Sequence, residues 1–288
     1  MKDFDWRILT TLYNTKSLTK TAESLFTSQP NVTKRLKSME AELSVQVVVR
    51  TAKGVAFTPQ GEYLAQRATE IVNLIDETKE HVRGVAGSPT GTIRLAAPNS
   101  FVRNELPSIL HHYRQKPQIT FQLVTRLSDD IPRLVESGES DVGFAHGEIT
   151  DGLCKHRYLS EVLNVISRNA ITIDALPGLP QVDFVRSAST QRMIQAWWQR
   201  RFGAPQNVAL QVNTGDICLE IVRKGIGFGF FFGTSYFKQY DDLCGLIVTD
   251  EGGVPIKRDT WLIYSKRNFE RTVVREFIDF ILNEHKRH

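Results

Sequence analysis

The chain has few cysteines and none of the common catalytic or metal-binding motifs. Its three cysteines, Cys154, Cys218 and Cys244, form neither a CxxC pair nor a Cys/His pattern with metal-ligand spacing. No GxSxG turn occurs, and the glycines within residues 225–229 do not complete a GxGxxG sequence. We therefore expect no catalytic residues, no metal and no cofactor.

The scarcity of cysteine also bears on the compartment. Scattered cysteines are typical of buried thiols in a reducing environment, with a peroxide-sensing pair, Cys154 and Cys218, as the alternative. No apolar run reaches the ~18 residues of a membrane span. The acidic start, with Asp3 and Asp5, lacks the apolar core of an export signal. These absences predict a cytoplasmic protein without a membrane partner.

Most of the chain carries no excess of positive or negative charge. Residues 1–60 hold 6 Lys and 3 Arg against 2 Asp and 3 Glu, whereas the remaining 228 residues are balanced at 27 against 27. The formal net charge of +4 therefore belongs to the N-terminal part. A basic module on a neutral body is the electrostatic pattern of a DNA-binding head that carries a different kind of domain.

Two short helices joined by a tight turn are predicted within Ser17–Glu42. Apolar residues recur at helical spacing at Leu18, Ala22, Leu25 and Phe26, and then at Val32, Leu36, Met39 and Leu43. The two apolar stripes are expected to bury against each other, which is the arrangement of a helix-turn-helix.

The second helix carries the side chains expected to contact DNA. Ser28 suits its N-cap and Pro30 its first turn, so the helix begins at about Gln29. The residues that offer amides, hydroxyls and cations to base edges and phosphates, with the cap and proline that start the helix, are Ser28, Gln29, Pro30, Asn31, Thr33, Lys34 and Lys37. Taken alone, these residues also fit an ordinary amphipathic helix with a solvated basic face.

A β-hairpin is predicted directly after this helix. Val45–Arg50 and Val55–Thr58 are strand-like runs around a turn at Thr51–Gly54. The hairpin places Arg50 and Lys53 for contact with phosphates. A winged helix-turn-helix accounts for the whole module, and this favours DNA binding over the amphipathic alternative.

Together with three later segments, this module resembles the LysR-type transcriptional regulators. The segments, in order, are SLTKTAESLFTSQPNVTKRLKSMEAELSV, VRTAKGVAFTPQGEYL, GTIRLAAPNSFVRNELPSIL, LVESGESDVGFAHG and LEIVRKGIGFGF. The resemblance implies base-edge contacts from Gln29, Pro30, Thr33 and Lys34 and backbone contacts from Arg50 and Lys53. The wing departs from the family pattern at Val48–Val49, and Phe232 stands where the family tends to have Pro.

The resemblance also implies the organisation and the partners of the chain. An α+β multidomain protein is expected, with a winged helix-turn-helix at 1–58, a linker helix at 59–87 and a bilobal α/β regulatory domain, similar to periplasmic binding proteins, at 91–288. Its lobes are expected at about 91–160 with 266–288, and at about 161–265. The expected partners are a double-stranded DNA operator, a small-molecule effector and further copies in a homodimer or homotetramer, with RNA polymerase as an additional candidate.

The linker helix is predicted from Thr58 to about Val85, with Pro59 in its first turn. Apolar or small residues recur in steps of four and three at Leu64, Ala68, Ile71, Ile75, Thr78 and Val82. So narrow a seam favours pairing of two subunits, which DNA half-sites also require, over packing on its own domain. Small residues and a proline then predict a hinge over residues 85–91.

Strand-like and helical patterns alternate through the remaining ~200 residues. Strands are expected at Thr92–Ala97, Ile119–Thr125, Asp141–Ala145, Val182–Arg186, Val208–Val212, Phe228–Phe232 and Trp261–Tyr264, and helices at Glu105–Arg114, Ile131–Ser137, Gln191–Phe202, Ile217–Lys224 and Arg271–Glu284. This alternation predicts a largely parallel sheet whose ligands lie beyond the carboxyl ends of the strands. The resemblance implies that the chain crosses between the lobes near Tyr158–Glu161 and again near Ser265.

Three helix starts offer backbone N–H groups to a carboxylate or phosphate, namely Pro98–Phe101, Ser187–Thr190 and Asn213–Asp216. Each also needs an ordinary cap, and for Thr214 the capping role is preferred. The resemblance, which implies a pocket between the lobes, favours the first two. The residues expected to bind an effector, with an organic anion such as a carboxylate as the expected class, are Asn99, Ser100, Phe101, Ser189 and Thr190.

Two further side chains are assigned to the same pocket. His146 ends a predicted strand and points toward the crevice, where it can pair with an acid, although a hydrogen-bonded surface histidine is an alternative. The strand Phe228–Phe232 is unusually aromatic, and packing on both faces of a buried strand explains most of it. One of its residues, Phe230, is assigned to the pocket wall.

Other protein classes fit only part of the sequence. An enzyme is disfavoured by the missing motifs. A solute-binding protein would share the bilobal body, but it would need an export signal that the start of this chain does not show. A redox-sensing regulator that uses Cys154 and Cys218 is the alternative within the resembled family.

Overall fold

The computed structural model describes residues 1–51, 54–84, 91–113, 119–149, 151–235 and 237–285. These residues form two compact units, one of Met1–Gly91 with Ser137–Glu139 and one of Thr92–Glu136 with Ser140–His288. We describe each unit by itself. The predicted hinge at residues 85–91 lies, apart from Gly91, outside the described residues.

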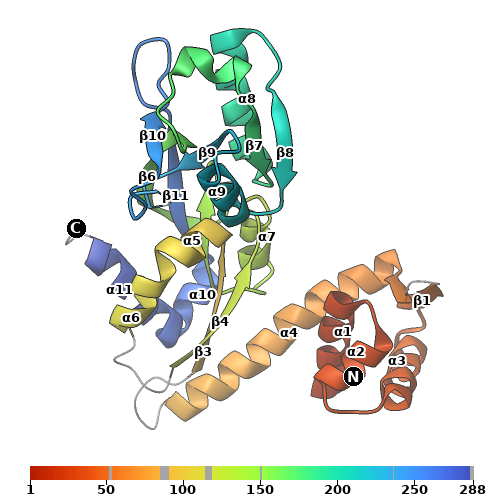
Figure 1. The fold of residues 1–288 in the computed structure, drawn as a ribbon. Coiled ribbons are helices and arrows are strands. Elements are labelled where there is room, and N and C mark those ends of the chain that lie inside the picture. The colour runs from red at the N-terminus through yellow and green to blue at the C-terminus, as the bar shows by residue number, and fades with distance from the viewer. Residues whose placement is uncertain (52–53, 85–90, 114–118, 150, 236, 286–288) are drawn as a thin grey trace. The chain divides into compact units, whose positions relative to one another are not determined.

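The first unit is the predicted winged helix-turn-helix followed by a long helix (Figure 1). Its elements are α1 (Asp3–Thr15), α2 (Leu18–Ser24), α3 (Gln29–Leu43), β1 (Val48–Thr51), β2 (Gly54–Phe57) and α4 (Pro59–Gly84). Strands β1 and β2 pair antiparallel, with Val48 opposite Phe57 and Thr51 opposite Gly54. The helix pair and the wing therefore form as the sequence predicts.

The core of this unit joins α1 to α3. Ile8, Leu9 and Leu12 of α1 are buried with the α3 residues of the predicted stripe, except for one at its end. That exception is Leu43, which is 40% exposed. The prediction was also wrong for Phe26, whose side chain is 98% exposed because the chain leaves α2 before it, with a left-handed φ of 51°.

Helix α4 has about the predicted length, but the residues of its predicted apolar seam differ in burial. Leu64 and Ala68 pack into the core of their own unit, and Ala65 and Val72 are buried as well. Own-domain packing, the alternative to subunit pairing, therefore holds for the first part of the helix. Farther along, Thr78 and Val82 are exposed, and the pairing of subunits stays a prediction.

The second unit is built on one mixed sheet with the strand order β4-β3-β5-β11-β6-β9-β7-β8, and β10 pairs with β6 beside this path. Its strands are β3 (Gly91–Ala97), β4 (Ile119–Thr125), β5 (Val142–His146), β6 (Cys154–Ser167), β7 (Gln181–Phe184), β8 (Val208–Val212), β9 (Phe228–Phe232), β10 (Cys244–Ile247) and β11 (Lys257–Tyr264). Its helices are α5 (Asn99–Asn104), α6 (Leu106–Tyr113), α7 (Ile131–Glu136), the 3-10 helix η1 (Ile173–Gly178), α8 (Ala188–Phe202), α9 (Gly215–Arg223), α10 (Lys266–Glu270) and α11 (Thr272–His285).

The predicted parallel character holds only for part of this sheet. Strand β3 pairs parallel with β5, and β7 pairs parallel with β8 and β9. Strand β11 instead runs antiparallel to both β5 and β6, and β6 runs antiparallel to β9. The sheet is therefore mixed. Its antiparallel central strands connect two smaller sets of parallel strands.

Strand β6 divides the unit into two lobes. Its residues Cys154–Val162 pair with β11, and Leu163–Ser167 pair with β9. We call β3, β4, β5, β11 and their helices the first lobe, and β7, β8, β9, β10, α8 and α9 the second lobe. The second crossing lies at the start of β11 rather than near Ser265, since Thr260–Tyr264 already pair with β5 of the first lobe.

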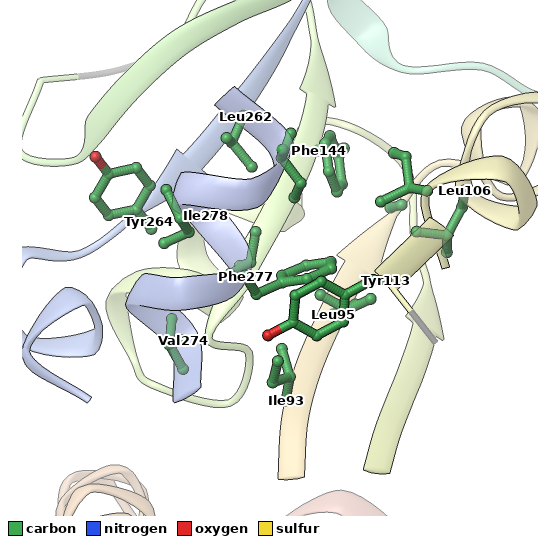
Figure 2. Packing of buried hydrophobic residues seen from close by; sticks show 14 of the residues in the cluster. Ile93, Leu95, Leu106, Tyr113, Phe144, Leu262, Tyr264, Val274, Phe277 and Ile278 are labelled. Atoms are coloured by element: carbon green, nitrogen blue, oxygen red, sulfur yellow. The ribbon is translucent and has the colours of Figure 1, made fainter. Parts of the chain in front are cut away.

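Each lobe has its own aromatic core. In the first lobe, Phe277 and Tyr113 meet edge to face beside Leu95 of β3, and Phe144 and Leu262 belong to the same cluster (Figure 2). In the second lobe, Trp197 and Trp198 of α8 pack against Phe230, with the rings of Trp197 and Phe230 5.8 Å apart. Core packing therefore accounts for much of the aromatic strand β9, as expected.

Candidate functional site

The exposed face of α3 carries most of the residues predicted to contact DNA. Ser28, Pro30, Asn31, Lys34 and Lys37 are exposed, and Gln29 and Thr33 are half-buried. The Ser28 hydroxyl accepts a hydrogen bond from the backbone N–H of Asn31 at 3.4 Å, so it caps the helix as predicted. The Gln29 amide donates to the Thr33 hydroxyl at 3.2 Å, which orients both side chains on one face.

Only two of the three cations of α3 are available to a ligand. Arg35 donates from Nε to Asp5 of α1 at 2.7 Å, and the Asp5 carboxylate is buried. Lys34 and Lys37 are exposed and have no acid partner among the described residues. Arg35 therefore ties α3 to α1, while Lys34 and Lys37 give the exposed face its positive charge.

The wing is anchored to the helices at both of its ends. Glu40 of α3 accepts from the backbone N–H groups of Val47 at 2.8 Å and Val48 at 3.3 Å. The backbone N–H of Val55 donates to the carbonyl of Lys16, at the end of α1, at 3.0 Å. Arg50 is exposed on β1. Lys53, the other predicted wing contact, lies outside the described residues.

A cavity of about 470 Å³ lies between the lobes of the second unit. The residues that line it include Asn99, Ser100, Arg126, Ser128, Asp130, His146 and Arg258 of the first lobe, and Arg186, Ser187, Thr190, Thr214 and Phe230 of the second. Five predicted residues thus meet at one cavity, namely Asn99, Ser100, His146, Thr190 and Phe230. Phe101 and Ser189 do not line it.

His146 is a buried part of the cavity wall rather than a surface histidine. Its Nε2 lies 3.1 Å from the Ser100 hydroxyl and its Nδ1 lies 2.8 Å from the Thr260 hydroxyl. Burial lowers the pKa of His146 well below its ordinary value, and the nearby Arg258 guanidinium lowers it further. The imidazole is therefore neutral near pH ~7, so it offers a hydrogen bond rather than a charge.

The prediction for Phe101 was wrong. Its ring is buried in the core of the first lobe and stacks on Phe144, with the ring centroids 4.1 Å apart. Neighbouring residues of one helical turn point in different directions, so Ser100 reaches the cavity while Phe101 faces the sheet. A short run next to a strand does not by itself show which of its side chains faces the ligand.

The helix starts are satisfied largely by the protein itself. Thr214 accepts from the backbone N–H of Ile217 at 3.5 Å, which confirms its capping role. Ser187 accepts from the backbone N–H of Thr190 at 3.4 Å at the start of α8. The Ser189 hydroxyl donates to Asp129 of the first lobe at 3.1 Å. Ser189 is therefore already engaged by a carboxylate of this chain.

Three guanidinium groups at the cavity were not assigned from the sequence. Arg186 pairs with Asp183, and Arg258 donates to Glu161 at 2.8 Å. Arg126 donates to the carbonyl of Thr125 at 2.8 Å and has no acid partner among the described residues. A signal for Arg126 was present, since it directly follows the predicted strand Ile119–Thr125 at the carboxyl end where ligands bind.

The cysteines lie apart from one another in the structure. Cys218 is buried in the second lobe, where its thiol donates to the carbonyl of Val182 at 3.3 Å. Burial raises the pKa of Cys218 to about 12. Cys154 packs against the separate core of the first lobe. Within the described parts of the chain, no group of three or more His, Cys, Asp or Glu residues is arranged to hold a metal ion.

None of the helices in the described residues combines the length and the apolar character needed to span a bilayer.

Comparison with known proteins matches both parts of the chain. Residues 4–62 match the family model described as "Bacterial regulatory helix-turn-helix protein, lysR family", and residues 86–286 match "LysR substrate binding domain". The HTH-type transcriptional regulator YraN of Bacillus subtilis (strain 168) is 31% identical over 99% of this chain and 98% of its own length. YkuM of the same organism is 25% identical over 95% of this chain and 94% of its own length.

Solved structures share the fold at low sequence identity. Full-length CbnR in complex with its target DNA gives a TM-score of 0.69 at 17% identity, covering 98% of this chain and 99% of that one. A full-length OxyR variant from Pseudomonas aeruginosa gives 0.68 at 15% identity, covering 98% and 94%. The relatives found by sequence are transcriptional regulators and not enzymes, as predicted. The chain belongs to the LysR family of bacterial helix-turn-helix transcriptional regulators, and it carries the effector-binding domain of that family.

Proposed function

We propose that α3 reads an operator in the major groove of DNA through Gln29, Thr33 and Lys34. The observation that supports this is the Gln29–Thr33 hydrogen bond of 3.2 Å, which holds an amide and a hydroxyl on the exposed side of the helix. Fixed amides and hydroxyls suit base edges. Ser28, Pro30, Asn31 and Lys37 flank this pair. We assign phosphate contacts to Arg50 of the wing and to Lys53, which lies outside the described residues.

Variants of α3 test this division. Gln29→Ala removes a base contact, so it should relax the preference for the operator over other sequences by roughly 10-fold, within the ~1–3 kcal/mol of one base contact. Lys37→Ala removes a phosphate contact, so it should weaken binding to every sequence alike and lower the salt slope by about one. Operators found by genome-wide mapping of the protein's DNA sites supply the probes. Equal losses for both variants on every sequence would contradict the assignment.

We further propose that the effector is an organic anion, a carboxylate for example, bound in the cavity between the lobes. The observation that carries this proposal is Arg126, a guanidinium at the cavity without an acid partner among the described residues. Hydroxyls of Ser100 and Thr190 and the neutral His146 supply hydrogen bonds, with Asn99 beside them and the ring of Phe230 as an apolar wall. A charged group, a few polar groups and aromatic rings are typical of a small-molecule site.

A ligand screen tests the effector class. Mono- and dicarboxylates are titrated into the full-length protein while thermal unfolding is followed, since a ligand that binds the folded state raises the midpoint. For a carboxylate that binds, Arg126→Gln should lower the affinity at least ~10-fold because a charge-assisted hydrogen bond is lost. Arg200→Gln changes an exposed arginine of α8 outside the cavity and should have no effect. Equal affinities of all three proteins would refute the role of Arg126.

The cavity also supports small-molecule sensing over the redox alternative. Cys154 and Cys218 belong to the cores of different lobes, and burial holds Cys218 in the unreactive thiol form. We therefore expect Cys154→Ser and Cys218→Ser to leave the regulatory response intact. A response to peroxide that either substitution abolishes would reverse this choice.

A further inference from the structure

Two carboxylates join the two lobes in opposite directions, and each is a chain neighbour of residues that line the cavity. Asp129, in the first lobe, accepts from the backbone N–H of Ala188 at 2.5 Å and from the Ser189 hydroxyl at 3.1 Å, both at the start of α8 in the second lobe. Asp216, in the first turn of α9 in the second lobe, pairs with Arg103 and accepts from the Asn99 amide at 3.3 Å, both on α5 of the first lobe. Each lobe therefore supplies one carboxylate to the other.

We propose that Asp129 and Asp216 form an interlobe latch, which holds the two lobes together beside the cavity. The inference rests on the proposed effector function of the cavity, since it concerns how that site opens and closes. Every partner in the two contacts belongs to this chain. This arrangement of the lobes is thus stabilised by groups of the protein itself.

The contact of Asp129 is more than an ordinary helix cap. The first N–H groups of a helix have no partner within the helix. At the start of α8, the Ser187 hydroxyl accepts from the N–H of Thr190, and Asp129 accepts from the N–H of Ala188. A carboxylate at a helix N-terminus is favoured by the helix dipole as well. The partner of this amide comes from the other lobe, so the amide loses it when the lobes separate.

The latch is weak enough to be reversible. Its groups are partly exposed to solvent, and exposed ion pairs contribute little one by one. Both contacts nevertheless join the same two lobes, so separation of the lobes breaks both together. A ligand shifts such an equilibrium only by binding one state better than the other. The latch therefore sets how often the empty protein opens, and with it the rate at which an effector can enter.

Hydrogen exchange at the Ala188 amide tests the first contact in the full-length protein without effector or DNA. The probe is the exchange rate of this single amide, resolved by fragmentation mass spectrometry. Asp129→Ala removes its acceptor and should raise the rate at least ~10-fold. Asp241→Ala changes an exposed carboxylate that does not line the cavity, and it should leave the rate unchanged. An amide that exchanges equally fast in the unaltered protein and in Asp129→Ala would overturn the proposal.

The second contact distinguishes a latch from two separate surface contacts. Arg103→Gln breaks the pair with Asp216 and does not touch Asp129. If both contacts hold the lobes together, this change should also raise the exchange rate at Ala188, by about two- to fivefold. An unchanged rate would show that the contacts are independent, and no latch would exist. Failure of the ligand screen would leave these exchange rates as they are, so the two proposals can fail separately.

Discussion

Asp5 determines which cations of α3 are free. Its carboxylate is buried between the Arg35 guanidinium and the backbone N–H of Lys2, which donates to it at 2.6 Å. A buried charge needs partners of this kind because desolvation is costly. Arg35 therefore serves the fold, although it lies in the same basic run as the neighbouring lysines.

Replacement of Arg35 should lower stability more than replacement of a neighbouring lysine. Arg35→Ala leaves the Asp5 charge buried without its main partner, so we expect a loss of about 2–3 kcal/mol in the free energy of unfolding of the first unit. Urea unfolding, followed by hydrogen exchange at the buried amides of α1 and α3, measures it. Lys34→Ala is the control, with a change within ~0.5 kcal/mol. A loss for Arg35→Ala as small as that of the control would refute the structural role.

His146 should make stability depend on pH. Its pKa is lowered in the folded protein, whereas the unfolded chain takes up a proton near pH ~6.5. Stability is therefore full above that pH and is lost as the pH falls toward the lower, folded pKa. His146→Gln cannot take up this proton, so its unfolding midpoint should fall less between about pH 7 and about pH 5. The exposed His112→Gln is the control, and identical pH slopes for all three proteins would contradict the assignment.

Among the elements, the wing depends on the close approach of two backbones. Gly54 begins β2 with a φ of 127°, and a Cβ atom built there would lie 2.5 Å from the carbonyl oxygen of Lys16. The neighbouring N–H of Val55 bonds to this same carbonyl at 3.0 Å. Any side chain at position 54 would therefore push the wing away from the end of α1.

Gly54→Ala should displace the wing and weaken DNA binding without changing base preference. The steric conflict and the positive φ together should cost about 1–3 kcal/mol of stability in the first unit. Operator and unrelated DNA should lose affinity by similar factors, because the wing is proposed to contact phosphates. Binding titrations on both DNAs measure this. Val49→Ala, an exposed change on the partner strand, is the control. Unchanged stability and affinity in Gly54→Ala would count against this view of the wing.

Elements with a regular pattern could be predicted from the sequence, and elements without one could not. The apolar residues of α3 recur at helical spacing, and Phe228–Phe232 is a continuous apolar run. Both elements were therefore predicted from the sequence. Strand β6 was missed because the first part of Cys154–Ser167 is largely exposed or half-buried and carries charged residues without a continuous apolar face.

The cavity was predictable only where its residues follow a strand or open a helix. Ser100 and Thr190 hold such positions, and both line the cavity. Phe101 holds one too, but packing turned its ring into the core of the first lobe. Asp129 was missed because its contact with Ala188 joins distant segments and leaves no local pattern.

At the scale of the whole molecule, the two parts of α4 differ in burial. Its first part is buried in its own unit, whereas Leu74 and Val82 are 56% and 68% exposed. Exposed apolar residues on one helix are a reason to expect a partner. We propose that this later part pairs two subunits, in a dimer or as part of a tetramer.

Leu74→Glu should therefore weaken subunit association. A charge in an apolar helix contact is costly, so we expect the dissociation constant to rise at least ~10-fold. Sedimentation velocity across a range of concentrations measures it. Arg67→Glu alters a charged, exposed residue of the same helix that pairs with Glu70 and is the control. If Leu74→Glu and the unaltered protein associate equally well, subunits pair through another surface.

The position of β11 in the sheet has a consequence for biosynthesis. This strand lies between β5 and β6, yet it follows all the other strands along the chain. As the polypeptide leaves the ribosome, β5 and the first part of β6 emerge without the neighbour that will join them. Their open edges are sites where a nascent chain can pair wrongly or aggregate. Translation must therefore pass through the whole second lobe before the first lobe can close its sheet.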